Sequence, residues 1–170
     1  MLHNGDINMI NNTILHCIKN QDFTPCSKEC NGCSEGINMC MHEPCVLTPS
    51  EARALIDAGF QDKLTIDWVD NAAGAPVYYY LLCGAVGWVK QMRTDDTQKT
   101  RCTFLGADNR CELHELGLKP TEGKVACCKY NDFEAKFIGI ATRDNMLPSW
   151  DTEENQKLIL NISLDWGLHE

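Results

Sequence analysis

Residues 26–45, CSKECNGCSEGINMCMHEPC, carry five of the eleven cysteines of this 170-residue chain. Between residues 22 and 46 no apolar residues recur at the period of a helix or a strand. Hydrophobic packing alone is therefore not expected to order this segment. We predict that bound metal fixes it, in a metal-stapled loop.

The spacing of these cysteines favours metal binding. Zinc sites prefer thiolates separated by about two to four residues, because a short loop can then direct two sulfurs to one tetrahedral ion. Three residues separate Cys26 from Cys30, two separate Cys30 from Cys33, and four separate Cys40 from Cys45.

A second set of cysteines follows far along the chain, in CTFLGADNRCELHELGLKP and just after it. Asp108 and Asn109 favour a turn, which predicts a hairpin or tight loop with one cysteine on each arm. We expect this second set to meet the first, and eight of the nine thiolates would fill two four-thiolate sites. The predicted ligands are Cys26, Cys30, Cys33, Cys40, Cys45, Cys102, Cys111, Cys127 and Cys128.

The identity of the metal stays open between zinc and iron, since thiolate sets hold both. Residues 26–33 have the C-x3-C-x2-C spacing that radical-SAM enzymes use for a [4Fe-4S] cluster, but the chain is too short for their barrel. A plain iron–sulfur cluster or non-haem iron remains the alternative to one or two zinc ions. His42 or His114 could replace a cysteine, and disulfides or a thiol redox switch are further alternatives.

Composition limits the other classes of function. The formal net charge of −9 disfavours general nucleic-acid binding. The longest apolar run, residues 75–89, is interrupted by Pro76, Gly84 and Gly87, so no membrane span is expected. The N-terminus shows no secretory signal, and the cysteine-rich composition then favours a soluble protein of the reducing cytoplasm. The expected partner is a metal ion, and a protein partner is left open.

Local patterns predict a small single domain of class α+β over residues 1–170. Its metal-binding core covers about residues 22–130, and C-terminal helices cover residues 131–170. Thr48 to Glu51 predict a capped helix that ends at Gly59. The other expected elements are a helix over 6–19, one or two strands within 77–89, a helix from Asp132, and a last helix over 152–166 with Leu158, Ile159 and Ile162 facing inward. Cys17 and Cys83 are predicted to be core residues.

With these motifs in hand, the chain resembles the YkgJ-type cysteine-cluster proteins, a zinc- or iron-chelating domain family. The resemblance lies in a cysteine-rich start that leads into PCVLTPSEARALIDAGF, followed by CTFLGADNRCELHELGLKPTEGKVACC. It spans about residues 26–130 and implies metal chelation, although many members have an adjacent Cys-Cys where this chain separates Cys40 from Cys45. It implies little about activity.

No motif for enzymatic catalysis stands out. The chain lacks Gly-x-Ser-x-Gly, a phosphate-binding glycine loop and His-Glu-x-x-His. Whether it is an enzyme is left open. A metal-binding protein with a structural, carrier or adaptor role is favoured over an iron enzyme or redox protein.

Overall fold

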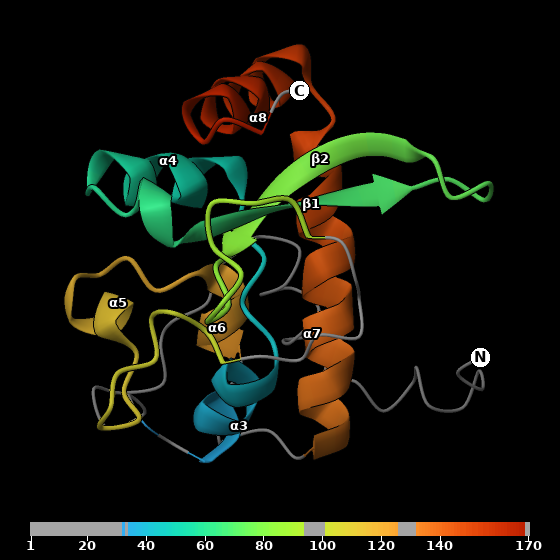
Figure 1. Ribbon diagram of the computed structural model, residues 1–170. Coiled ribbons are helices and arrows are strands. Elements are labelled where there is room, and N and C mark those ends of the chain that lie inside the picture. Colours follow the sequence, from blue (N-terminus) through green and yellow to red (C-terminus); the bar gives the residue numbers. More distant parts are fainter. Residues whose placement is uncertain (1–31, 33, 94–100, 126–131, 169–170) are drawn as a thin grey trace, which may run out of the picture.

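A two-stranded antiparallel hairpin crosses the middle of the molecule (Figure 1). Its strands are β1 (Leu64–Asp70) and β2 (Pro76–Cys83). The computed structural model describes residue 32 and residues 34–93, 101–125 and 132–168. At the inner end of the hairpin Leu64 pairs with Cys83, and the residues there are buried. The outer end projects from the body, and Val77 is 54% exposed.

The sequence predicted β2 within the aromatic run, but β1 was not expected. The predicted run of 77–89 yields one strand, because Gly84 ends it with a close backbone approach. The Gly84 N–H donates to the carbonyl of Lys63 at 2.7 Å, and a Cβ at this position would lie 2.5 Å from that oxygen. Only glycine fits there without displacement of the backbone.

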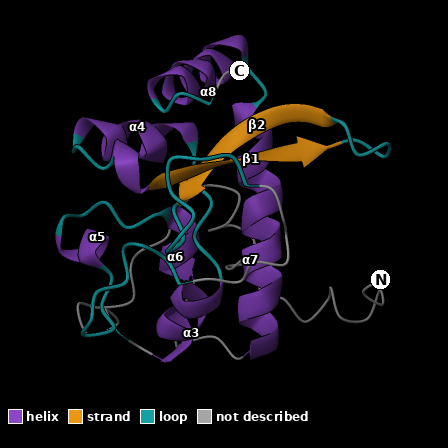
Figure 2. Ribbon diagram, viewed as in Figure 1, coloured by secondary structure: helices purple, strands orange, loops and turns teal. Residues whose placement is uncertain are grey.

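Helices cover both sides of the hairpin (Figure 2). Helices α4 (Pro49–Asp57) and α8 (Glu153–Asp165) lie on one side, and both contact β2. The short helices on the other side are α3 (Ser34–His42), α5 (Glu112–Glu115) and α6 (Thr121–Val125). The long α7 (Asp132–Met146) runs beside the hairpin and continues into the 3-10 helix η3 (Leu147–Trp150). The 3-10 helix η2 (Gln61–Lys63) leads into β1. These elements confirm a small α+β fold.

The predicted capping of α4 is confirmed. Thr48 accepts from the N–H of Glu51, and the Glu51 carboxylate accepts from the N–H of Thr48 at 2.9 Å. The second oxygen of the same carboxylate accepts from the N–H and the hydroxyl of Thr121, both at 2.6 Å. One side chain therefore caps α4 and fixes the first residue of α6.

The core lies between the inner half of the hairpin and the helices. Trp150 is fully buried, and its indole N–H donates to the Leu47 carbonyl at 2.7 Å. Phe104 is also buried and meets Phe60 edge-to-face, with ring centroids 5.5 Å apart. Other core side chains come from α4, both strands and α8, including Leu55, Leu64, Ile66, Leu81, Ile159 and Ile162.

The C-terminal helix is confirmed with its predicted inward face. Thr152 caps α8, Ile159 and Ile162 are buried, and Leu158 packs against the core. The predicted helix over 6–19, and Cys17 within it, lie outside the described residues.

The segment 22–46 is more ordered than predicted where the structure describes it. Residues 34–42 form α3, with Met39 and Cys40 packed against the core, and Cys45 is 4% exposed. Its apolar contacts were missed because they are few and lack a regular period. A metal-stapled loop is not seen among the described residues.

A buried carboxylate and a half-buried guanidinium lie against the hairpin. Asp67 is 6% exposed; it accepts from the Tyr80 hydroxyl at 2.9 Å and pairs with Arg93 at 3.2 Å. Burial and the neighbouring Asp67 together raise the pKa of Tyr80 far above its ordinary value. These contacts fix the chain after β2 against the hairpin. No helix among the described residues is both long and apolar enough to cross a membrane.

Replacing Glu51 by alanine tests its double role. We expect Glu51→Ala to lower the free energy of unfolding by about 2–3 kcal/mol, because caps on α4 and α6 are lost together. Urea denaturation measures the change. Glu154→Ala is the control, since Glu154 is 84% exposed and forms a surface ion pair with Arg53. Equal effects in the two variants would contradict the role of Glu51.

Candidate metal centre

Backbone hydrogen bonds bring three cysteine-bearing segments together. The N–H of Cys83, at the end of β2, donates to the carbonyl of Cys45 at 2.9 Å. The N–H of Cys102 donates to the carbonyl of Cys40 at 2.7 Å. Residues that lie far apart in the sequence thus become neighbours through main-chain pairing.

Cys111 joins them through the predicted turn, which is confirmed. Leu105 and Cys111 form an antiparallel bridge, with Asp108 and Asn109 at the turn between them. Asn109 has φ of +61°, a left-handed conformation that asparagine tolerates better than most residues. Cys102 and Cys111 therefore lie on the two arms, as expected.

The sulfurs differ in exposure. Cys45, Cys83 and Cys102 are buried, whereas Cys40 and Cys111 are half-buried. All five of these described cysteines are thiols and not disulfides. The burial of Cys83 was predicted. Its position next to Cys102 was not.

The electrostatics of Cys45 reflect this crowding. Burial raises the pKa of Cys45 well above its ordinary value, and the nearby Cys40, Glu122 and Cys102 raise it further. Four acidic groups in one buried region oppose each other when ionised. A cation among them would reverse this effect.

Two of the thiols accept hydrogen bonds at sulfur. The Cys83 thiol donates to Cys102 Sγ, which lowers the pKa of Cys102, and the backbone N–H of Phe104 adds to this effect. Burial raises the pKa of Cys111, but the N–H of Leu113 donates to its sulfur and opposes the rise. Such donors stabilise a thiolate and orient its sulfur.

A buried carboxylate fixes the segment that contains Cys45. Glu122, 1% exposed, accepts from the N–H of Val46 at 2.6 Å and pairs with Arg143 Nε. Arg143 also forms an ion pair with Glu43 at 2.6 Å. Through Glu43 directly and through Glu122 to Val46, α7 therefore contacts both ends of the segment that follows α3. Burial raises the pKa of Glu122, and the charge of Arg143 opposes that rise.

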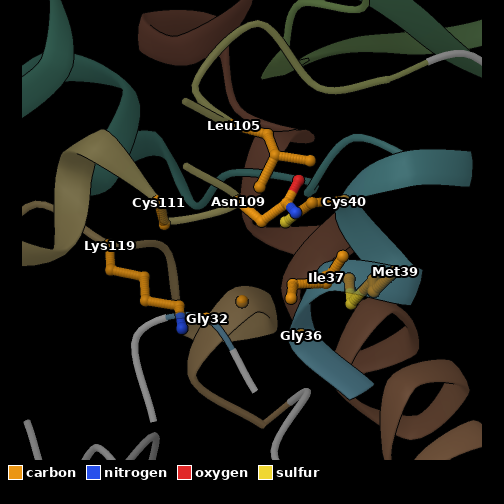
Figure 3. A pocket seen from close by; sticks show the side chains of 10 residues that line it. Gly32, Gly36, Ile37, Met39, Cys40, Leu105, Asn109, Cys111 and Lys119 are labelled. Carbon is orange, nitrogen blue, oxygen red and sulfur yellow. The ribbon is translucent and has the colours of Figure 1, made fainter. Parts of the chain in front are cut away.

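A small hollow opens beside the two half-buried thiols (Figure 3). Cys40 and Cys111 both line it. Gly32, Gly123 and Lys119 contribute to its other walls. The described residues therefore leave open space beside these two half-buried thiols.

Four of the nine predicted ligands fall within the described residues, and the structure gathers all four in this region. Cys26, Cys30, Cys33, Cys127 and Cys128 lie outside the described residues. Within the described part of the chain, no three side chains of Cys, His, Asp and Glu are arranged to hold a metal ion. The gathered thiols alone are thus not a complete site.

The two candidate histidines differ in position. His42 is exposed at the end of α3, where its Nδ1 donates to the Asn38 carbonyl at 2.8 Å. His114 is half-buried in α5, three residues after Cys111. Sequence reasoning missed Glu122, Lys119 and Gly123. The segment PTEGK offers no periodicity or ligand spacing by which they could have been found.

Comparison of the chain with family models, curated proteins and solved structures finds no match. The resemblance to YkgJ-type proteins therefore stays a prediction from the sequence motifs.

Removing the positive partner of Glu122 tests the buried ion pair. We expect Arg143→Met to lower the free energy of unfolding by about 3 kcal/mol, because a buried carboxylate loses its counter-charge. The loss should be larger at pH 8 than at pH 5.5. Without Arg143 the pKa of Glu122 in the folded state lies further above its unfolded value, so stability falls as pH rises between the two.

Glu122→Gln in the Arg143→Met background should recover part of the stability, since the unpaired charge is gone. Chemical denaturation at the two pH values measures both effects. Arg110→Met is the control, because the Arg110 side chain is 66% exposed. An Arg143→Met variant as stable as this control would contradict the proposed role of the ion pair.

Proposed function

We propose that this chain is a cysteine-cluster protein that holds zinc, as one or two ions, through thiolates, and that it has a structural, carrier or adaptor role. The observation that carries the proposal is the hollow shared by Cys40 and Cys111, which are separated by 70 intervening residues. Zinc bound by thiolates needs such a gathering of sulfurs from separate segments.

Two of the remaining predicted ligands lie close in the sequence to described residues of this region. Gly32 lines the same hollow, and Cys33 follows it directly in the sequence. Val125 is buried at the end of α6, and Cys127 comes two residues later. Consecutive Cα atoms are about 3.8 Å apart, so one or two residues of chain span only a short distance. They support the expectation that both cysteine sets serve one centre.

Hydrogen bonding at sulfur supports the same proposal. Cys102 and Cys111 each accept a backbone N–H from the residue two positions later, Phe104 and Leu113. A thiolate ligand is stabilised and oriented by such donors. The motif order that resembles YkgJ-type proteins implies metal chelation, and the cysteine-rich composition favours the reducing cytoplasm. No grouping of described residues favours a catalytic role.

Two neighbouring buried thiols allow a matched test of the ligand set. We expect Cys102→Ser to lose metal and to unfold at a lower temperature, because a thiolate ligand is removed. Cys83→Ser should keep its metal, since Cys83 is assigned to the core and to the hydrogen bond with Cys102. Elemental analysis and thermal melts measure the two effects. Metal loss in Cys83→Ser but not in Cys102→Ser would show that the ligand assignment is wrong.

Metal analysis of protein purified without oxygen separates zinc from iron. We expect colourless protein with stoichiometric zinc. Brown protein containing iron and acid-labile sulfide would replace the zinc proposal with the iron–sulfur alternative. Protein with neither metal, and with its thiols intact, would contradict metal binding altogether.

A further inference from the structure

Two buried thiols, those of Cys83 and Cys102, meet at the inner end of the hairpin. The chain around Cys102 pairs with the chain after β2: the N–H of Thr103 donates to the Gly84 carbonyl at 2.8 Å, and Ala85 and Cys102 form an antiparallel bridge. The Cys83 thiol donates a hydrogen bond to Cys102 Sγ. Two cysteines separated by 18 intervening residues are therefore in direct contact.

Main-chain hydrogen bonds hold both cysteines in place. The N–H of Cys83 donates to the Cys45 carbonyl at 2.9 Å, and the N–H of Cys102 donates to the Cys40 carbonyl at 2.7 Å. A disulfide requires Cα atoms within about 7 Å of each other and brings the two sulfurs to about 2 Å. Sulfurs that already share a hydrogen bond, on segments that already pair, have only a short distance left to close.

The direction of the hydrogen bond gives the two thiols different roles. Cys102 Sγ accepts from the Cys83 thiol and from the backbone N–H of Phe104, and such donors favour its thiolate. The thiolate is the form that attacks an oxidant. Cys83 keeps its proton, and its sulfur lies next to the atom that is oxidised. Cys102 is therefore the thiol that reacts first, and Cys83 is the thiol that resolves the product.

Burial selects the oxidant that reaches this pair. Cys83 is 1% exposed and Cys102 is 4% exposed, and both belong to the hydrophobic core. A large charged oxidant such as oxidised glutathione would have to displace several core side chains. Hydrogen peroxide is small and uncharged, so it needs only a small local opening of the core.

We propose that Cys83 and Cys102 form a reversible redox pair, in which hydrogen peroxide converts the two buried thiols into a disulfide. Resting on the proposed function, this bridge removes Cys102 from the ligand set, so oxidation releases the bound metal. Cys83, which the sequence assigned to the core alone, acquires a chemical role through its contact with a predicted ligand.

The oxidation takes place in two steps. The Cys102 thiolate attacks one oxygen of hydrogen peroxide, the O–O bond breaks, hydroxide leaves, and Cys102 becomes a sulfenic acid. The Cys83 sulfur then attacks the Cys102 sulfur, the S–O bond breaks, and water leaves with the Cys83 proton. Two thiols thus lose two electrons and two protons, and one hydrogen peroxide is reduced to two waters. A dithiol reductant reverses the change by thiol–disulfide exchange.

Peptide mapping of the oxidised full chain tests the pairing. Trypsin places Cys83 in the peptide 64–90 and Cys102 in the peptide 102–110, and each peptide contains a single cysteine. After peroxide treatment and blocking of the remaining thiols with N-ethylmaleimide, we expect mass spectrometry without reductant to find these two peptides joined. Dithiothreitol should separate them.

Two controls show whether the fold directs the bridge. Cys111→Ser should still form it, because the substitution removes a neighbouring thiol and leaves both partners in place. In urea, Cys102 should instead bridge mainly to Cys111, the cysteine nearest to it in the sequence, since a short loop closes at a lower entropic cost. Folded wild type in which Cys102 joins mainly to a cysteine other than Cys83, or becomes sulfinic acid while Cys83 is blocked by N-ethylmaleimide, would overturn the redox pair.

Zinc release, followed with a chromogenic chelator, tests the link to the metal. In the wild type we expect peroxide to release zinc, and dithiothreitol with added zinc to restore it. In Cys83→Ser this recovery should be lost, because a sulfenic acid without a resolving thiol proceeds to the irreversible sulfinic acid. Full recovery in Cys83→Ser would overturn the role of Cys83. Circular dichroism of each variant shows that the fold is retained.

The remaining outcomes separate this inference from the proposed function. Bound zinc without a bridge between Cys83 and Cys102 would overturn the redox pair and leave metal binding standing. A bridge that forms without loss of zinc would overturn the link to metal release and keep the redox pair. A bridge in a protein that contains no metal would keep the redox pair and contradict the proposed function.

Discussion

Main-chain pairing around the inner end of the hairpin is the constraint on which the rest of the structure depends. The carbonyls of Cys40 and Cys45 accept from Cys102 and Cys83, so the chain after α3 lies between the end of β2 and the start of the turn that leads to Cys111. These hydrogen bonds place several thiols close together, and burial, with the neighbouring thiols and Glu122 adding to it, raises the pKa of Cys45.

Two carboxylates then hold the short helix α6 against this arrangement. Glu51 binds Thr121, and Glu122 binds Val46 while Arg143 compensates its charge. A five-residue helix has little stability of its own, because the first turn fixes several residues for few hydrogen bonds. The side chains of Glu51 on α4 and Arg143 on α7 supply the additional contacts that stabilise this helix. The position of α6, as far as Val125, is thereby set by contacts made outside the cysteine cluster.

Local signals made much of the fold predictable. The capping box at Thr48 and Glu51, the turn at Asp108 and Asn109, the strand that ends at Cys83 and the helix after Thr152 each depend on residues close in sequence. The structure also gathers the predicted ligands Cys40, Cys45, Cys102 and Cys111. The features that could not be predicted depend on residues distant in the sequence. Apolar and polar residues alternate only weakly along β1, because both faces of the strand are buried near Leu64. Glu122 and Arg143 form their ion pair only when α6 meets α7. The sequence alone does not show which distant residue will pair with a given charged side chain.

The projecting end of the hairpin has a practical consequence. Residues 70–77 are all exposed, and Asn71 closes the turn with its own side chain by accepting from Ala73 and Ala75. Exposed loop tips tolerate added chain best, because no buried contact has to move. A reporter peptide or a fluorophore could therefore be grafted between Asn71 and Gly74, giving a handle on the molecule at the end of the hairpin opposite the thiols.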